Sequence, residues 1–312
     1  MNAPICCSVV IPVYNSSECL AELVRRIDET FRAMNAQYEL ILVNDCSRDN
    51  SWEVIRELAG KYPALMGVSL RKNFGQDNAL MAGLRLARGQ YVIIMDDDLQ
   101  HDPMYIPRLV AEIGKGHDVV FARYRHKKQS LWKNAGSWFN GKVAQIVLNK
   151  PKNIYLSPYK IIRADIVKAI CDYDGPYPYV DGLLFRVTGN FSQIDVEHRE
   201  RFKGTSSYTF WKSLKVWSYL ATNFSIIPLR IASCLGIAAA LLGMVLGVIF
   251  FFERIHNPHN PAGWASLIVS VLTFGGIQLI SIGIVGEYVG RVYLNINRRP
   301  QYVIGETTEK ST

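Results

Sequence analysis

The stretch that decides the fold is Tyr91–Pro103, "YVIIMDDDLQHDP", in which an apolar run leads directly into three aspartates. A short apolar run with polar residues after it is typical of a buried strand. Side chains of an extended segment alternate between two faces, so Asp96 and Asp98 are expected to point the same way and Asp97 to point away, toward solvent or a basic neighbour. Two carboxylates directed at one point repel each other, and the stretch therefore predicts a cation between them.

Oxygen ligands alone suit Mg²⁺ or Mn²⁺, and Mg²⁺ usually takes one or two carboxylates together with substrate phosphates. We therefore interpret Asp96 and Asp98 as metal ligands and catalytic residues that hold a nucleotide diphosphate through the ion. Gln100 lies on the same face and is a further candidate ligand. The alternative is an ordinary solvated acidic turn, because an Asp-x-Asp pattern by itself is common.

The first 125 residues alternate between strand-like and helix-like periodicity. Strands are expected at 5–14, 38–45, 65–70, 89–96 and 117–122, and helices at Glu18–Met34, Ser51–Tyr62, Gln76–Ala87 and Pro103–Gly114. Ser17 and either Asp49 or Asn50 are expected N-caps, and Gly89 is expected to end a helix. This order predicts an α/β domain with a mostly parallel sheet covered on both faces. Ligands bind beyond the carboxyl ends of such strands, where residues 12–15, Asn44, Asp45 and the aspartates should converge.

Two uncharged segments near the carboxyl end, Ile231–Phe252 and Trp264–Gly286, are each long enough to cross a bilayer as a helix. The basic residues that flank this pair are Arg230, Arg291, Arg298 and Arg299. Positive charge favours the cytoplasmic side, so the segments predict a multi-pass hairpin in the plasma (inner) membrane with the large domain in the cytosol. The net charge of +8 can indicate nucleic acid, an anionic membrane or a phosphorylated substrate as partner. With two such apolar segments in the chain, we expect the membrane and a phosphorylated substrate and no nucleic acid.

Two further stretches mix aromatic, basic and apolar residues at helical spacing, Ser130–Asn149 and Ser206–Ser225. Such helices suit the headgroup layer, although a helix packed on the domain is the alternative for each. The expected organisation is a catalytic domain over 1–205, a juxtamembrane helix over 206–229, the two transmembrane helices over 230–290 and a cytosolic tail over 291–312.

Several motifs together carry a resemblance to a known family. They are "SVVIPVYN" (8–15), "LILVNDCSRDNS" (40–51), "RKNFGQDNALMAGL" (71–84), "ARGQYVIIMDDDLQHDP" (87–103) and "GEYVGRVYLNINRRPQY" (286–302). Over almost its whole length the chain resembles the polyprenyl-phosphate glycosyltransferases, inverting enzymes of glycosyltransferase family 2 with the GT-A fold. Bactoprenol glucosyltransferases and undecaprenyl-phosphate formamido-arabinose transferases are similar in style. The resemblance implies transfer of a sugar from a UDP-sugar such as UDP-glucose to undecaprenyl phosphate, Mg²⁺ or Mn²⁺ as cofactor, and a homotetramer.

The resemblance also implies roles for individual positions. Pro12, Tyr14, Asn15 and Asp45 would line the nucleobase and ribose pocket, and Asn73 and Gln76 would border the nucleotide sugar. Asp96 and Asp98 would handle ribose, metal and diphosphate, assisted by Gln100. Arg123, Lys133, Ser137 and Arg201 would gather around the donor and acceptor phosphates, because phosphate needs charge-assisted donors. For the basic residues, an ordinary solvated cation is the alternative.

The chain departs from the family pattern at several positions. Ser16 stands where the family has an acid, Asp97 where it often has alanine, and Ser207 where it often has lysine. Ile154 occupies the place of an aspartate proposed as catalytic base in many relatives. Asp181 is a candidate to replace that base, and a helix-cap or loop aspartate is the favoured alternative. A lipid phosphate with a second pKa of about 6 is mostly a dianion at neutral pH and needs no base, so that orientation and charge neutralisation carry the reaction.

Two other functions compete with this one. A processive polysaccharide synthase would need more membrane spans and a QxxRW-like acceptor motif, neither of which the sequence contains. A non-catalytic membrane scaffold that keeps the fold is supported only by the missing base.

Overall fold

The computed structural model describes residues 5–124, 154–197, 227–256, 263–297 and 300–308. The chain divides into two units, Met1–Ser207 with Arg298–Thr312, and Tyr208–Asn297. Of the predicted features, the stretches 130–149 and 206–225 and the residues Lys133, Ser137 and Arg201 lie outside the described residues.

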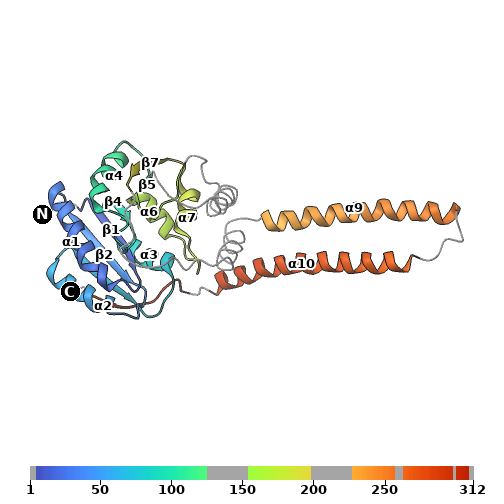
Figure 1. Cartoon of the computed structure of the whole chain (residues 1–312), viewed down its shortest axis with the longest axis horizontal. Helices are drawn as coiled ribbons and strands as arrows, with labels where there is room; N and C mark the ends of the chain where they lie inside the picture. The colour runs from blue at the N-terminus through green and yellow to red at the C-terminus, as the bar shows by residue number, and fades with distance from the viewer. Residues whose placement is uncertain (1–4, 125–153, 198–226, 257–262, 298–299, 309–312) are drawn as a thin grey trace. The chain divides into compact units, whose positions relative to one another are not determined.

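The first unit is built on a mixed sheet of eight strands in the order β7-β5-β6-β4-β1-β2-β3-β8 (Figure 1). The strands are β1 Cys7–Val13, β2 Tyr38–Asn44, β3 Leu65–Leu70, β4 Tyr91–Ile94, β5 Val119–Tyr124, β6 Lys160–Arg163, β7 Phe191–Val196 and β8 Ile304–Thr307. The pairs β1–β2, β1–β4, β2–β3 and β5–β7 are parallel, whereas β6 and β8 run antiparallel to their neighbours. The α/β fold class is confirmed.

Helices cover both faces of the sheet (Figure 1). They are α1 Ser17–Met34, α2 Ser51–Lys61, α3 Gln76–Leu84, a 3-10 turn Pro103–Tyr105, α4 Ile106–Ile113, α6 Ala164–Cys171 and α7 Val180–Val187. One buried cluster joins α1, α2 and α4 to side chains such as Ile11 of β1. A second joins α3, α6 and α7 to side chains such as Val10, the preceding residue of the same strand. The central strand β1 is therefore buried on both sides, as expected for a parallel sheet between helical layers.

The first two helices begin at one shared carboxylate. Asp49 Oδ2 accepts a hydrogen bond from the backbone N–H of Ser17 (3.1 Å), and Asp49 Oδ1 accepts one from the backbone N–H of Ser51 (3.1 Å). The N-cap positions themselves are Ser16 and Asn50, neither of which caps its helix through its own side chain. The predicted N-cap at Ser17 was therefore wrong by one residue. The side chain that accepts hydrogen bonds from the first turns of both helices is that of Asp49.

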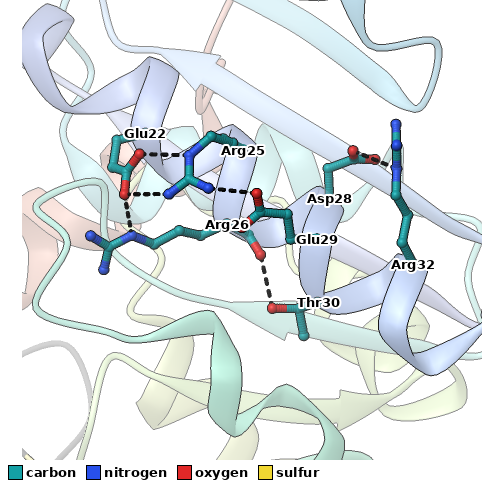
Figure 2. A network of polar contacts seen from close by, with 7 residues as sticks. All are labelled: Glu22, Arg25, Arg26, Asp28, Glu29, Thr30 and Arg32. Carbon is teal, nitrogen blue, oxygen red and sulfur yellow. Dashed lines mark hydrogen bonds and ion pairs between the residues drawn. The ribbon is translucent and has the colours of Figure 1, made fainter.

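The exposed face of α1 carries a network of ion pairs within one helix (Figure 2). Glu22 contacts both Arg25 and Arg26, Arg25 also contacts Glu29, and Asp28 contacts Arg32. These contacts follow the three- and four-residue spacing of a helix surface. The network supports helix formation on the face that points away from the core.

The prediction that Gly89 ends a helix was wrong, because α3 already ends at Leu84. Instead, Gly89 lies directly against β1, and its backbone N–H donates to Ser8 Oγ (2.8 Å). A Cβ at this position would lie 2.6 Å from the backbone nitrogen of Ser8. Glycine is needed here because the backbone approaches the neighbouring strand too closely for a side chain.

The segment after the second long helix returns to the sheet. β8 pairs antiparallel with β3, and Thr308 Oγ1 accepts from the backbone N–H of Gly67 (2.8 Å). Gln301 is buried, and its Nε2 donates to the backbone oxygens of Tyr173 and Gly175, both at 2.7 Å. This segment belongs to the predicted tail over 291–312, for which no strand was predicted, because a four-residue strand with one large apolar residue gives little periodicity.

The second unit contains two long helices, α9 Ile227–His256 and α10 Trp264–Ile296. Each includes a stretch apolar enough to cross a membrane: Ala232–Ile249 with a mean hydropathy of 2.3, and Thr273–Leu294 with a mean hydropathy of 1.2. Neither stretch is buried by protein, so their large apolar side chains need another apolar environment. The prediction of two candidate membrane spans is confirmed, and both helices extend beyond the predicted bounds.

Candidate active site

A cavity of about 400 Å³ opens at the carboxyl ends of β1, β2 and β4. Its lining includes most of the residues that the sequence singled out for the donor: Pro12, Tyr14, Asp45, Asn73, Gln76, Asp96 and Asp98. Val13, Ser16, Gly75 and Asp97 complete the lining. Polar residues from four separate loops thus meet at one edge of the sheet, where open α/β sheets bind ligands.

Asn15 has a different place from its cavity-lining neighbours. Its backbone has φ 55°, a left-handed conformation that asparagine tolerates better than most residues. Its Oδ1 accepts from the backbone N–H of Arg48 (2.8 Å), and its own N–H donates to Ser47 Oγ (3.0 Å). Asn15 therefore joins the loops after β1 and β2 and supports the cavity from outside its lining.

Asp45 organises the loop that leads into α3. Its two carboxylate oxygens accept from the backbone N–H groups of Phe74 (2.7 Å) and Gly75 (2.8 Å). Burial raises the pKa of Asp45, and these two hydrogen bonds act in the opposite direction. Because Asn73 and Gln76 flank the bonded residues, Asp45 fixes the loop that carries both of them to the cavity.

All three aspartates of the motif line the cavity, which corrects the prediction that Asp97 points away. Asp97 Oδ2 accepts from the backbone N–H of Tyr14 (3.2 Å), and Asp97 also bonds the side chain of Ser16. Burial raises the pKa of Asp97, and these hydrogen bonds lower it. The alternation rule failed because β4 ends at Ile94, two residues before the first aspartate.

Asp96 is held from two sides. Its Oδ1 accepts from Gln76 Nε2 (2.9 Å), and its backbone N–H donates to His101 Nδ1 (2.9 Å). His101 is buried, and its ring stacks on that of Tyr159 with centroids 5.4 Å apart. Because the Nδ1 atom of this ring accepts a hydrogen bond, the hydrogen of the neutral ring lies on Nε2. His101 was not predicted as a site residue, although it stands within the same motif.

Asp98 is the second predicted metal ligand. Its Oδ1 accepts from the backbone N–H of Gln100 (3.1 Å). Gln100 thus contacts Asp98 through its main chain and does not belong to the cavity lining.

The donor set of the cavity fits a hard divalent cation that is shared with a ligand. Within the described ranges, no group of three or more His, Cys, Asp or Glu side chains is arranged to hold a metal by itself. Asp96 and Asp98 supply carboxylate oxygens, which Mg²⁺ and Mn²⁺ prefer. A diphosphate would have to contribute the remaining oxygens, which is the usual coordination of Mg²⁺ at nucleotide sites.

The other predicted residues lie away from this cavity or outside the described residues. Arg123 on β5 pairs with Asp195 of β7 (Nε to Oδ1, 2.5 Å) and is half-exposed. Asp181, in the first turn of α7, forms an ion pair with Lys160 of β6. Ile154, at the position where the family resemblance implies an aspartate, packs against the apolar cluster that includes side chains of α3, α6 and α7.

Comparison with known proteins agrees with this architecture. The model of the family described as glycosyl transferase family 2 matches residues 8–171, and the model described as the GtrB C-terminal hairpin matches residues 227–292. The chain therefore belongs to glycosyltransferase family 2, and it is a glycosyltransferase.

Individual relatives are similar over nearly their full length. The chain is 33% identical to the undecaprenyl-phosphate 4-deoxy-4-formamido-L-arabinose transferase of Shewanella sediminis, over 97% of this chain and 94% of that protein. It is 35% identical to the protein of the same name from Edwardsiella ictaluri, over 95% of this chain and 92% of that protein. Among solved structures, glucosyl-3-phosphoglycerate synthase of Mycobacterium tuberculosis in complex with Mn²⁺, UDP-glucose and phosphoglyceric acid shares the fold. It is 16% identical, with a TM-score of 0.50 over 70% of this chain and 78% of that one.

Proposed function

We propose that this enzyme transfers a sugar, with inversion, from a UDP-hexose such as UDP-glucose to a polyprenyl phosphate. The observation that carries the proposal is the cavity with Asp96 and Asp98 at the carboxyl ends of the strands, in a chain that also has two membrane-spanning candidates. The names of the relatives support undecaprenyl phosphate as acceptor.

The donor would occupy the cavity in the following way. Pro12, Tyr14 and Asp45 would border the nucleoside, and Asn73 and Gln76 would border the sugar. Asp96 and Asp98 would hold Mg²⁺ or Mn²⁺, which when bound neutralises charge on the diphosphate leaving group. Gln76 would orient Asp96 through the hydrogen bond described above, and Asp45 would hold the loop that carries Gln76.

The acceptor needs no proton transfer to the protein. A phosphate monoester has a second pKa of about 6 and is mostly a dianion at neutral pH. One of its oxygens forms the new bond to the anomeric carbon, while the bond from that carbon to the nucleotide diphosphate breaks on the opposite side. The apolar residue Ile154 at the place of the usual base is therefore compatible with catalysis. Arg123, Lys133, Ser137 and Arg201 remain candidates for contacting the phosphates.

The two long helices support a reaction that takes place at a membrane. We propose that α9 and α10 span the plasma (inner) membrane as a hairpin, with the first unit in the cytosol, because the basic flanking residues favour that orientation. The homotetramer implied by the family resemblance stays a prediction, and the mass of the detergent-solubilised complex measures it directly.

The test is a donor screen with membranes that contain the full-length chain. Labelled UDP-sugars are supplied with undecaprenyl phosphate and either Mg²⁺ or Mn²⁺, and lipid-linked label is measured. We expect one donor to give a lipid carrying a single sugar. Product of increasing length would instead support a processive synthase, and no product from any donor would support the scaffold.

A further inference from the structure

A second group of charged residues lies outside the cavity and has no part in the proposed chemistry. Lys160 of β6, Asp181 of α7 and Asp77 of α3 form what we call the charge cluster. Lys160 and Asp181 form an ion pair with side-chain exposures of only 4% and 16%. The Lys160 ammonium also lies 5.4 Å from the centre of the Phe121 ring.

Lys160 acts on both carboxylates of the charge cluster. Burying an ammonium group is costly unless an opposite charge compensates it, and Asp181 supplies that charge directly. The pKa of Asp77 is raised from 3.8 to about 6, mainly by burial and in part by the charge of Asp181, while the hydrogen bond from Val180 and the charge of Lys160 act in the opposite direction. Lys160 therefore carries a charge opposite to those of two acids on two different helices.

The charge cluster holds the first turn of α7. Asp77 Oδ1 accepts a hydrogen bond from the backbone N–H of Val180, the first residue of α7, at 3.2 Å. The next residue, Asp181, pairs with Lys160. Acidic groups at this end of a helix also interact favourably with its unpaired N–H groups. Two successive residues of α7 are thus anchored to α3 and β6.

The charge cluster is connected to the cavity through two adjacent residues of α3. Gln76 Nε2 donates a hydrogen bond to Asp96 Oδ1 (2.9 Å) at the cavity. The next residue, Asp77, accepts a hydrogen bond from the Val180 N–H of α7, and the charge of Lys160 lowers the pKa of Asp77. The first turn of α3 is therefore fixed on one side by the cavity carboxylate and on the other by the charge cluster.

We propose that Lys160 is a positioning residue for donor binding. Its pairing with Asp181 fixes the first turn of α7, whose Val180 N–H bonds Asp77 and so holds the first turn of α3 where Gln76 meets Asp96. Lys160 itself touches no substrate and acts through Gln76. This inference rests on the proposed function, since it takes the cavity as the nucleotide site.

The test uses the full-length chain in detergent, with UDP and MnCl₂ as the probe and calorimetry as the measurement. The variants are Lys160→Met, Gln76→Ala and the double variant. We expect each single variant to weaken UDP binding about tenfold, and the double variant to be no weaker than the weaker single one, since residues that act as a unit are not additive. A loss of packing stability unrelated to Gln76 would instead give effects that multiply.

One control and one further test variant keep the result interpretable. Lys115→Met removes an exposed lysine that pairs with Glu112, and it should bind UDP like the wild type. Asp77→Ala breaks the contact with α7 but keeps the Lys160–Asp181 pair, so it should also weaken UDP binding even if Lys160→Met does not fold. If Asp77→Ala, or folded Lys160→Met, binds UDP with wild-type affinity, this inference is wrong and the proposed function still stands. Failure of the wild type to bind UDP with Mn²⁺ would overturn the proposed function as well.

Discussion

Asp97 accepts a hydrogen bond from the backbone N–H of Tyr14, at 3.2 Å, and so joins the aspartate motif after β4 to the loop after β1. We expect Asp97→Ala to release this loop and to raise the KM for the donor about tenfold, because the side of the cavity proposed for the nucleoside loses its support. Asp97→Asn keeps an oxygen acceptor and should retain most of the affinity. Steady-state kinetics with both variants measures the difference, and equal KM values for alanine and wild type would contradict this role.

Asp98→Ala tests the metal assignment. We expect loss of sugar transfer at every Mg²⁺ and Mn²⁺ concentration, with membrane insertion unchanged, because a single remaining carboxylate binds the ion and diphosphate poorly. The matched control is Asp165→Ala, which removes an exposed aspartate paired with Arg163. Wild-type turnover in Asp98→Ala would refute the assignment.

Asp77 predicts a pH dependence of stability. Its pKa is raised from 3.8 to about 6, so the folded state binds more protons than the unfolded state between these values. The free energy of unfolding should therefore fall as pH rises from about 4 to about 6, by up to about 3 kcal/mol, and then stay level.

Asp77→Asn keeps an acceptor for the Val180 N–H and removes this titration. We expect the variant to be more stable than the wild type at pH 7.5 and to lose that advantage at pH 4.5. Thermal unfolding of both proteins across this range measures the effect. A constant difference at all pH values would show that Asp77 does not titrate in this window.

Gly89→Ala should destabilise the domain strongly. The new Cβ would lie 2.6 Å from the Ser8 nitrogen and 2.7 Å from the Cys7 carbonyl carbon, and backbone atoms in the central strand cannot move aside. Overpacking of this kind costs about 1–3 kcal/mol or more.

Gly60→Ala is the control for that substitution. Gly60 lies inside α2 with nothing within 4 Å of the added Cβ, so alanine should stabilise the helix by about 0.5–1 kcal/mol. Denaturant unfolding of the two variants should shift in opposite directions, and a shift in the same direction would contradict the packing described around Gly89.

The ion pairs along α1 should contribute little (Figure 2). Glu22 bonds both Arg25 and Arg26, which holds its pKa at about 2, but all three side chains are at least partly exposed to water. Exposed pairs are worth about 0–1 kcal/mol and are screened by salt. Glu22→Gln should therefore leave sugar transfer unchanged and lower stability slightly at low salt only, as measured by unfolding at two ionic strengths.

The class of fold could be predicted from sequence because strand and helix periods alternate clearly up to Tyr124. Beyond that point the elements are short: β6 has four residues and α7 has eight, and neither gives a strong period. Most of the cavity could be predicted because its residues stand directly after strands. The place of Asp97 in the cavity lining could not be predicted, because β4 ends at Ile94, before the motif, and side chains no longer alternate there. The Lys160–Asp181 pair could not be predicted either, because the two residues are separated in sequence and meet only in the folded domain.

The position of β8 has a consequence for how this protein is made. The strand at one edge of the catalytic sheet follows both long helices in the sequence, so the ribosome synthesises it after them. The enzyme domain cannot reach its finished state until the hairpin has emerged, and until then β3 offers an unpaired edge to other strands. Completion of the catalytic sheet thus depends on prior synthesis of both long helices.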